Sequence, residues 1–217
     1  MWEFVDKVIY INLDSREDRR KIMETFFEKG QIPLEKVVRF PAIKRIKGSL
    51  GCLESHTEAL RMAKKEGWKN VLILEDDLEW LDFESEYPKL EELTRLPKWD
   101  VILLVGWYWK YEFPRIYDAN NTGAYLVNSS YYNTLLQNRE DCVRRRFRKG
   151  FGFDFSRKNI DADTGWKSLQ KIHNWYGLNP CICRQVDGFS DHCRMNIKAS
   201  LVHGIGTAET RKLVYNK

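Results

Sequence analysis

Three consecutive acids, Glu75, Asp76 and Asp77, directly follow the apolar run 71–74. Such a run is typical of a buried strand, so the acids stand where the strand leaves the core. Neighbouring carboxylates repel one another and lose hydration, which costs free energy unless a cation offsets their charge. Glu75 and Asp77 share one side of the strand, and their oxygens suit Mg²⁺ or Mn²⁺. The alternative is an exposed acidic turn without a ligand.

A second polar corner follows the strand-like run 8–13, which ends at Asp14, Ser15 and Arg16. Ser15 is predicted to cap the next helix, with an acid three residues later as in a capping box. The polar residues of this corner either face a ligand or form only a turn and a helix cap.

Strand-like and helix-like segments alternate along the chain. Predicted strands cover 8–13, 37–40, 71–74, 101–105 and 124–127, and predicted helices cover 16–29, 50–66, 88–96 and 131–137. This alternation predicts an α/β fold, with a mostly parallel central sheet and helices on both faces. In such folds ligands bind beyond the carboxyl ends of the strands, which is where both polar corners lie.

The length of 217 residues fits a single domain over 1–217, whether alone or excised from a longer chain. A hydrophobic content of 43% excludes a disordered chain. The longest apolar runs fall far short of the ~20 residues of a membrane-spanning helix. The first residues carry acids where a secretory signal would be basic and then apolar, so we expect a cytoplasmic protein.

The net charge of +5 is mild and spread along the chain, which favours an anionic small ligand such as a nucleotide over a nucleic acid. The densest basic run, 144–149, is either a mobile flap over a phosphate or a solvated helix end. The five cysteines are odd in number, and we expect them to be reduced. A zinc site from Cys181, Cys183, His192 and Cys193 lacks the usual two-residue gap between paired cysteines.

Other catalytic patterns are absent from the sequence. An aspartyl-phosphate phosphatase needs an Asp where Glu75 stands. The chain also has neither a P-loop nor a G-x-S-x-G nucleophile elbow.

Several short motifs occur in a defined order over most of the chain. They are Ile11-Asn12-Leu13-Asp14 with Arg16 and Asp18-Arg19, Gly51-Cys52 with Ser55-His56, Glu75-Asp76-Asp77, Ala124-Tyr125-Leu126-Val127, and Pro180, Gln185 and Ser190-Asp191. Together they resemble glycosyltransferase family 25, which contains lipopolysaccharide glycosyltransferases, procollagen galactosyltransferases and similar enzymes that glycosylate viral capsids. The segment 142–163 departs from the family's pattern.

The resemblance implies a GT-A type nucleotide-sugar-binding domain. It implies inverting transfer of a hexose from a UDP-sugar, usually UDP-glucose or UDP-galactose, to a hydroxyl of a glycan or glycoprotein. It further implies Mn²⁺ or Mg²⁺ as cofactor, no nucleic-acid partner, and the host cytoplasm as the location of a viral member. The rival hypotheses are a carbohydrate-binding or degenerate transferase domain without turnover and a nucleic-acid binder that uses the arginine run 144–149.

The resemblance also implies roles for individual residues. Asp77 and Glu75 would hold the metal ion, with His203 as a third ligand and His192 as its alternative. Asp163, or else Asp161, would be the general base, although Asp163 could instead only cap a helical segment over 164–176. The donor nucleotide would bind at Asn12, Leu13, Asp14, Arg16, Glu75 and Asp76.

Two further groups carry a structural and a functional interpretation. His56 lies in an apolar helix stripe, which favours a buried, hydrogen-bonded histidine over a ligand, and Cys52 is expected in the core. The aromatic residues Trp107, Tyr108, Trp109 and Tyr111 either stack on sugar rings or belong to the core.

Overall fold

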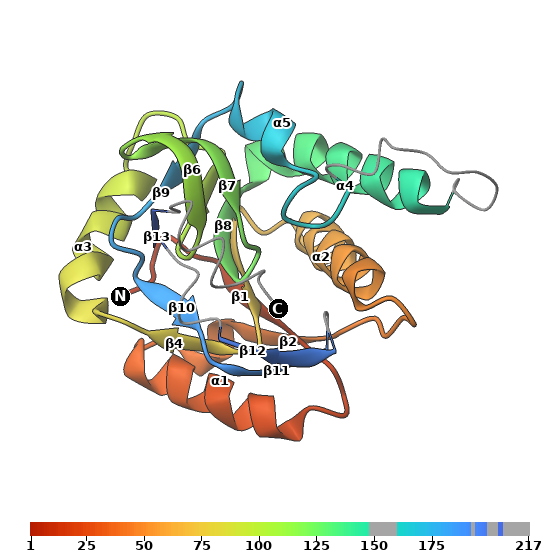
Figure 1. Ribbon diagram of the computed structural model, residues 1–217. Coiled ribbons are helices and arrows are strands. Elements are labelled where there is room, and N and C mark those ends of the chain that lie inside the picture. The colour runs from red at the N-terminus through yellow and green to blue at the C-terminus, as the bar shows by residue number, and fades with distance from the viewer. Residues whose placement is uncertain (148–159, 192–193, 199–203, 206–217) are drawn as a thin grey trace.

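A nine-stranded sheet forms the centre of the computed structural model, which describes residues 1–147, 160–191, 194–198 and the backbone of 204 and 205 (Figure 1). The strand order is β13-β6-β7-β9-β5-β8-β3-β1-β2. These strands are β1 (Lys7–Asn12), β2 (Val37–Pro41), β3 (Asn70–Glu75), β5 (Val101–Leu103), β6 (Trp107–Glu112), β7 (Arg115–Asn120), β8 (Ala124–Asn128), β9 (Trp175–Gly177) and β13 (Gly204–Ile205).

Helices cover both faces of the sheet (Figure 1). They are α1 (Glu17–Lys29), α2 (Gly48–Lys65), α3 (Phe83–Thr94), α4 (Tyr132–Phe147) and the short α5 (Lys167–Gln170), with 3-10 turns at Leu34–Lys36 and Ser129–Tyr131. Apolar side chains of α1 and α3 pack on one face, and those of α2 and α4 pack on the other. The α/β class and the two helical layers confirm the prediction.

The strand directions place several chain segments at one edge of the sheet. β1 pairs in parallel with β2 and β3, and the pairing of Ile11 with Glu75 sets the carboxyl ends of β1 and β3 side by side. β8 is antiparallel to both β3 and β5, so the sheet is mixed in detail. Because β8 starts where β3 ends, the connection 121–123 reaches the same edge, where the Glu75 amide donates to the Gly123 carbonyl at 2.7 Å.

Two small two-stranded sheets lie outside the main sheet. β4 (Leu78–Trp80) pairs with β10 (Cys183–Gln185), and β11 (Gly188–Ser190) pairs with β12 (Met195–Ile197), both antiparallel. β4 follows the acidic triplet directly and contacts α1, so the returning segment 183–190 lies close to the acids. Within the described part of the chain, no helix has the length and apolar character needed to cross a membrane.

Two local predictions were wrong. Ser15 does not cap α1: Arg16 holds the cap position without a side-chain cap, and its carbonyl accepts from the Asn12 side chain at 3.0 Å instead. The segment 164–176 is not a continuous helix, because only Lys167–Gln170 is α-helical and Trp175 already belongs to β9. The β6–β7 hairpin was not predicted, since its bulged, aromatic strands do not alternate cleanly.

Candidate functional site

The two polar corners meet at the carboxyl ends of β1 and β3. The buried Asn12 side chain donates to the Asp76 carboxylate at 2.7 Å. Its Oδ1 atom accepts from Arg20 Nε and Arg39 Nε, each at 3.0 Å. Asn12 therefore joins the acidic triplet to a cluster of arginines.

Arg19, which sequence reasoning did not single out as a site residue, supplies a positive charge to the triplet. It lies in the first turns of α1, and its Nη1 atom is 2.6 Å from Asp76 and 3.3 Å from Asp77. Its Nη2 atom donates to the Phe189 carbonyl of β11 at 2.9 Å. The sequence feature that could have pointed to Arg19 is its position three residues after Arg16, which brings the two arginines near one another at the start of α1.

Glu75 and Asp77, which strand alternation is expected to place on one side, share a hydrogen-bond donor. Gln185 Nε2 donates to Glu75 Oε2 at 3.0 Å and to Asp77 Oδ1 at 3.3 Å. Thr122 donates to Glu75 Oε1 at 2.6 Å. Because oxygens of both carboxylates converge on one small donor, the residues present fit a hard divalent cation such as Mg²⁺ or Mn²⁺.

Burial raises the pKa of Asp77 to about 7; the Arg19 guanidinium lowers it, while Glu75 and Asp76 raise it further. The pKa of Asp76 is also raised by burial, against the opposing effect of Arg19 and Asn12. The site thus holds more negative charge than its own arginine neutralises, which is the electrostatic condition for attracting a cation or a cation-bound phosphate.

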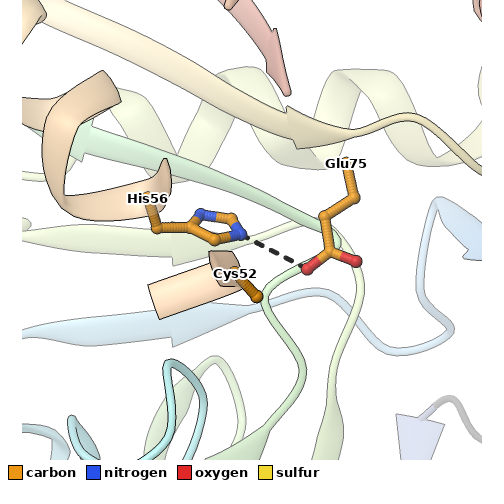
Figure 2. A group of neighbouring side chains, drawn as sticks. All are labelled: Cys52, His56 and Glu75. Carbon is orange, nitrogen blue, oxygen red and sulfur yellow. Dashed lines mark ion pairs between the residues drawn. The ribbon is translucent and has the colours of Figure 1, made fainter. Parts of the chain in front are cut away.

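His56 is buried and hydrogen-bonded, as predicted, but it also faces the triplet (Figure 2). Its Nδ1 atom lies 2.9 Å from the Tyr125 hydroxyl, and its Nε2 atom lies 3.4 Å from Glu75 Oε1. Burial lowers the pKa of His56, although Glu75 acts in the opposite direction. Cys52, one helical turn earlier, is half-buried beside it rather than deep in the core.

The two candidate bases have different surroundings. Asp163 accepts from Asn120 Nδ2 at 2.9 Å and from the Asn121 amide at 3.4 Å, so it does not serve as a helix cap. The Asn121 side chain in turn donates to Gln185 at 2.9 Å, which connects Asp163 to the triplet. Asp161 is instead engaged in an ion pair with Arg146.

The remaining donor-site candidates lie at the start of α1. Asp14 is exposed and pairs with Arg39, whose hydrogen bond lowers the pKa of Asp14. Arg16 pairs with Asp18 and with Asp191 next to β11. Leu13 is half-buried and offers its carbonyl to the Arg16 amide at 3.0 Å. These residues adjoin Asn12, and their binding of a nucleotide remains a prediction.

His203, His192 and Cys193 lie outside the described residues. Cys181 and Cys183 belong to cores on opposite faces of the sheet, so these two residues of the zinc site considered from the sequence point apart.

The aromatic run belongs only in part to the core, and its stacking on sugar rings stays a prediction. Tyr108 is fully buried in the core, and Tyr111 packs against it. Half-buried Trp109 donates to Asn120 at 2.9 Å, and Asn120 also binds Asp163, so this indole lies near the candidate base.

The first arginines of the basic run form the last turn of α4. Arg144 is exposed and pairs with Asp141, as expected of a solvated helix end. The end of the run, residues 148 and 149, lies outside the described part of the chain, so the flap interpretation stays a prediction.

No protein-family model and no curated protein sequence matches the chain. Among solved structures, a glycosyltransferase involved in the glycosylation of the major capsid of PBCV-1 is similar at 10% identity and a TM-score of 0.50, over 80% of this chain and 81% of that one. A197 from STIV aligns at 14% identity and a TM-score of 0.43, over 89% and 91% of the two chains. A putative glucose-1-phosphate thymidylyltransferase from Bacillus anthracis aligns at 12% identity and a TM-score of 0.44, over 83% and 70%. The first likeness concerns the fold alone, and the fold is GT-A-like.

Proposed function

We propose that this chain is a metal-dependent inverting glycosyltransferase that moves a hexose from a UDP-sugar to a hydroxyl of a glycan or glycoprotein. The convergence of Glu75 and Asp77 on Gln185, at the carboxyl edge of a GT-A-like sheet, is the observation that carries the proposal. The motif resemblance to glycosyltransferase family 25 supports it. So does the activity of the glycosyltransferase that shares the fold.

In this proposal Asp77 and Glu75 would hold Mn²⁺ or Mg²⁺, and the ion would supply positive charge for the diphosphate leaving group. Asn12 keeps Asp76 in place, and Arg19 fixes the two buried carboxylates relative to α1. The diphosphate would thus meet a preorganised set of charges that costs little reorganisation when UDP leaves.

Asp163 is the proposed base. It would accept the proton of the acceptor hydroxyl as that oxygen bonds to the anomeric carbon and the bond to UDP breaks. Asn120 and the Asn121 amide hold its carboxylate, whereas Asp161 is occupied by Arg146. The nearby indole of Trp109 is a surface on which a sugar ring could stack.

The primary test is a panel of UDP-sugars with Mn²⁺, scored by UDP release without acceptor. We expect release from one hexose donor, and at least a 100-fold lower rate for Asp77→Asn, because several kcal/mol of charge stabilisation are lost. Asp141→Asn, which changes an exposed acid on α4, is the matched control and should keep the wild-type rate.

Calorimetry separates the proposal from its rival. The transferase hypothesis requires UDP affinity that depends on Mn²⁺ and weakens in Asp77→Asn. Unchanged UDP binding in that variant would contradict the metal site. Sugar binding without UDP affinity or release would favour a carbohydrate-binding domain.

A further inference from the structure

Cys52, His56 and Glu75 come together where α2 meets the end of β3 (Figure 2). One ligand atom of each, a thiol sulfur, an imidazole nitrogen and a carboxylate oxygen, lies within 4.8 Å of the others. Cys52 and His56 are one helical turn apart and therefore project from the same face of α2. Glu75 enters from the sheet, so two separate elements build the cluster.

The His56 ring is oriented as a metal-bound imidazole would be. The side chain is 1% exposed, and Nε2 faces the cluster, where it lies 3.4 Å from Glu75 Oε1 in an ion pair and makes no hydrogen bond. The opposite nitrogen, Nδ1, is bound to the Tyr125 hydroxyl at 2.9 Å, which fixes the ring. Ligating histidines typically use their second nitrogen in this way.

We propose that Cys52, His56 and Glu75 bind a zinc ion. Thiolate, imidazole and carboxylate are the donor types of zinc sites, and three protein ligands leave one position of a tetrahedron open. The Thr122 hydroxyl donates to Glu75 Oε1 at 2.6 Å and so orients the carboxylate ligand. The thiolate selects zinc over Mg²⁺ and Mn²⁺, which prefer oxygen.

The zinc site is distinct from the Asp77 site, although the two share a residue. Glu75 Oε1 faces His56 and Thr122, whereas Glu75 Oε2 faces Gln185, which also binds Asp77. Glu75 thus lies between two groups of possible ligand atoms: the Cys52 sulfur and His56 nitrogen on one side, and the Asp77 oxygens on the other. The inference stands on the three side chains and does not require the proposed transferase activity.

Cobalt substitution tests the site without an activity assay. The purified chain is stripped with a chelator, titrated with Co²⁺ and then with Zn²⁺. We expect one Co²⁺ per chain, a thiolate-to-cobalt charge-transfer band, and loss of that band on adding Zn²⁺. Cys52→Ser and His56→Gln should lose the band and bind zinc at least 100-fold more weakly. Cys181→Ser, which alters a buried cysteine beside Tyr108 and away from the cluster, should retain both.

Three results would overturn the inference: no charge-transfer band in the wild type, a retained band in Cys52→Ser, or loss of the band in Cys181→Ser with unchanged circular dichroism. Zinc-edge X-ray absorption of the loaded wild type, expected to show one sulfur and one imidazole ligand, tests the site without any variant. Asp77→Asn should lose Mn²⁺-dependent UDP binding yet keep zinc. This variant separates failure of the proposed function from failure of the zinc site.

Discussion

At the residue scale, Asp77 is subject to opposing effects on its ionisation. Burial, Glu75 and Asp76 raise the pKa of its carboxyl to about 7, while the Arg19 guanidinium acts against them. A carboxyl in this state stores unfavourable free energy at neutral pH in the metal-free protein. Residues arranged for a ligand commonly carry such a cost, which a bound cation would remove.

The raised pKa of Asp77 predicts how the free energy of unfolding depends on pH. The folded-state pKa of Asp77 is raised above the ordinary value of 3.8, so its contribution to stability is fully present below pH 3.8 and is lost as the pH rises through 7. Asp77, together with Asp76, whose pKa burial also raises, should make the free energy of unfolding of the chelator-treated protein fall between about pH 4 and pH 7, while His56, whose pKa burial lowers, acts in the opposite direction. Asp77→Asn should flatten this fall and gain on the order of 2–4 kcal/mol at pH 8, measured by urea unfolding.

Asp18 provides a control with the opposite sign. Its hydrogen bond to Arg16 lowers the pKa of Asp18 to about 2, so its contribution is lost only as the pH falls below 3.8 towards 2. Asp18→Asn should leave the slope between about pH 4 and pH 7 unchanged. An equally steep fall in Asp77→Asn would show that another group titrates there.

At the element scale, the start of α2 is held against the segment that follows β2. The Ser55 hydroxyl accepts from the Ile43 amide at 2.8 Å and donates to the Gly51 carbonyl at 2.6 Å. A Cβ added at Gly51 would lie 2.3 Å from the Ile43 carbonyl oxygen. This close packing fixes the helical turn that carries Cys52 and His56.

Gly51→Ala should therefore destabilise the fold by about 1–3 kcal/mol, because backbone rather than a flexible side chain must move. It should also weaken Co²⁺ binding, since the turn carrying two of the proposed ligands shifts. Urea unfolding and cobalt titration measure the two effects. Lys65→Ala, an exposed change at the other end of α2, should alter neither, and equal losses in both variants would contradict the packing argument.

The elements near the N-terminus were more predictable than those near the C-terminus. β1 and β3 are continuous apolar runs, and α2 carries an apolar stripe at helical spacing, so each element could be recognised from its own residues. The segment 164–176 could not be divided from sequence, because Trp166 and Trp175 are both buried but belong to no common helix face. Tertiary packing decides its conformation rather than local pattern.

At the whole-molecule scale, one sheet separates two cores that share its central strands. Leu72 and Leu74 of β3 face the core beneath α1 and α3, while Val71 and Ile73 face the core beneath α2 and α4. All of these side chains are fully buried. Because one strand serves both cores, neither can be disrupted without affecting the pairing of β1, β3 and β8.

Leu72→Ala and Ile73→Ala should accordingly each cost about 2–5 kcal/mol, although they remove side chains from opposite faces. Each variant should unfold in one transition, with tryptophan fluorescence and far-ultraviolet circular dichroism coinciding. Two separated transitions in either variant would contradict a single folding unit.

The site was predictable where neighbouring strands end and unpredictable where distant segments return. The meeting of Asn12 with the acidic triplet follows from parallel pairing of β1 and β3. Gln185 and Thr122 touch Glu75 only because β10 and the start of β8 come back to this edge, and no local sequence pattern encodes that return.

The antiparallel direction of β8 makes one short segment responsible for several contacts of the candidate site. A single three-residue connection, 121–123, delivers Thr122 to Glu75, Asn121 to Gln185 and its own backbone to Asp163. An insertion or exchange in that short bend would therefore shift partners of Glu75, Gln185 and Asp163 together. Because Thr122 is buried and the Gly123 carbonyl accepts from the Glu75 amide, such a change should also lower the stability of the fold.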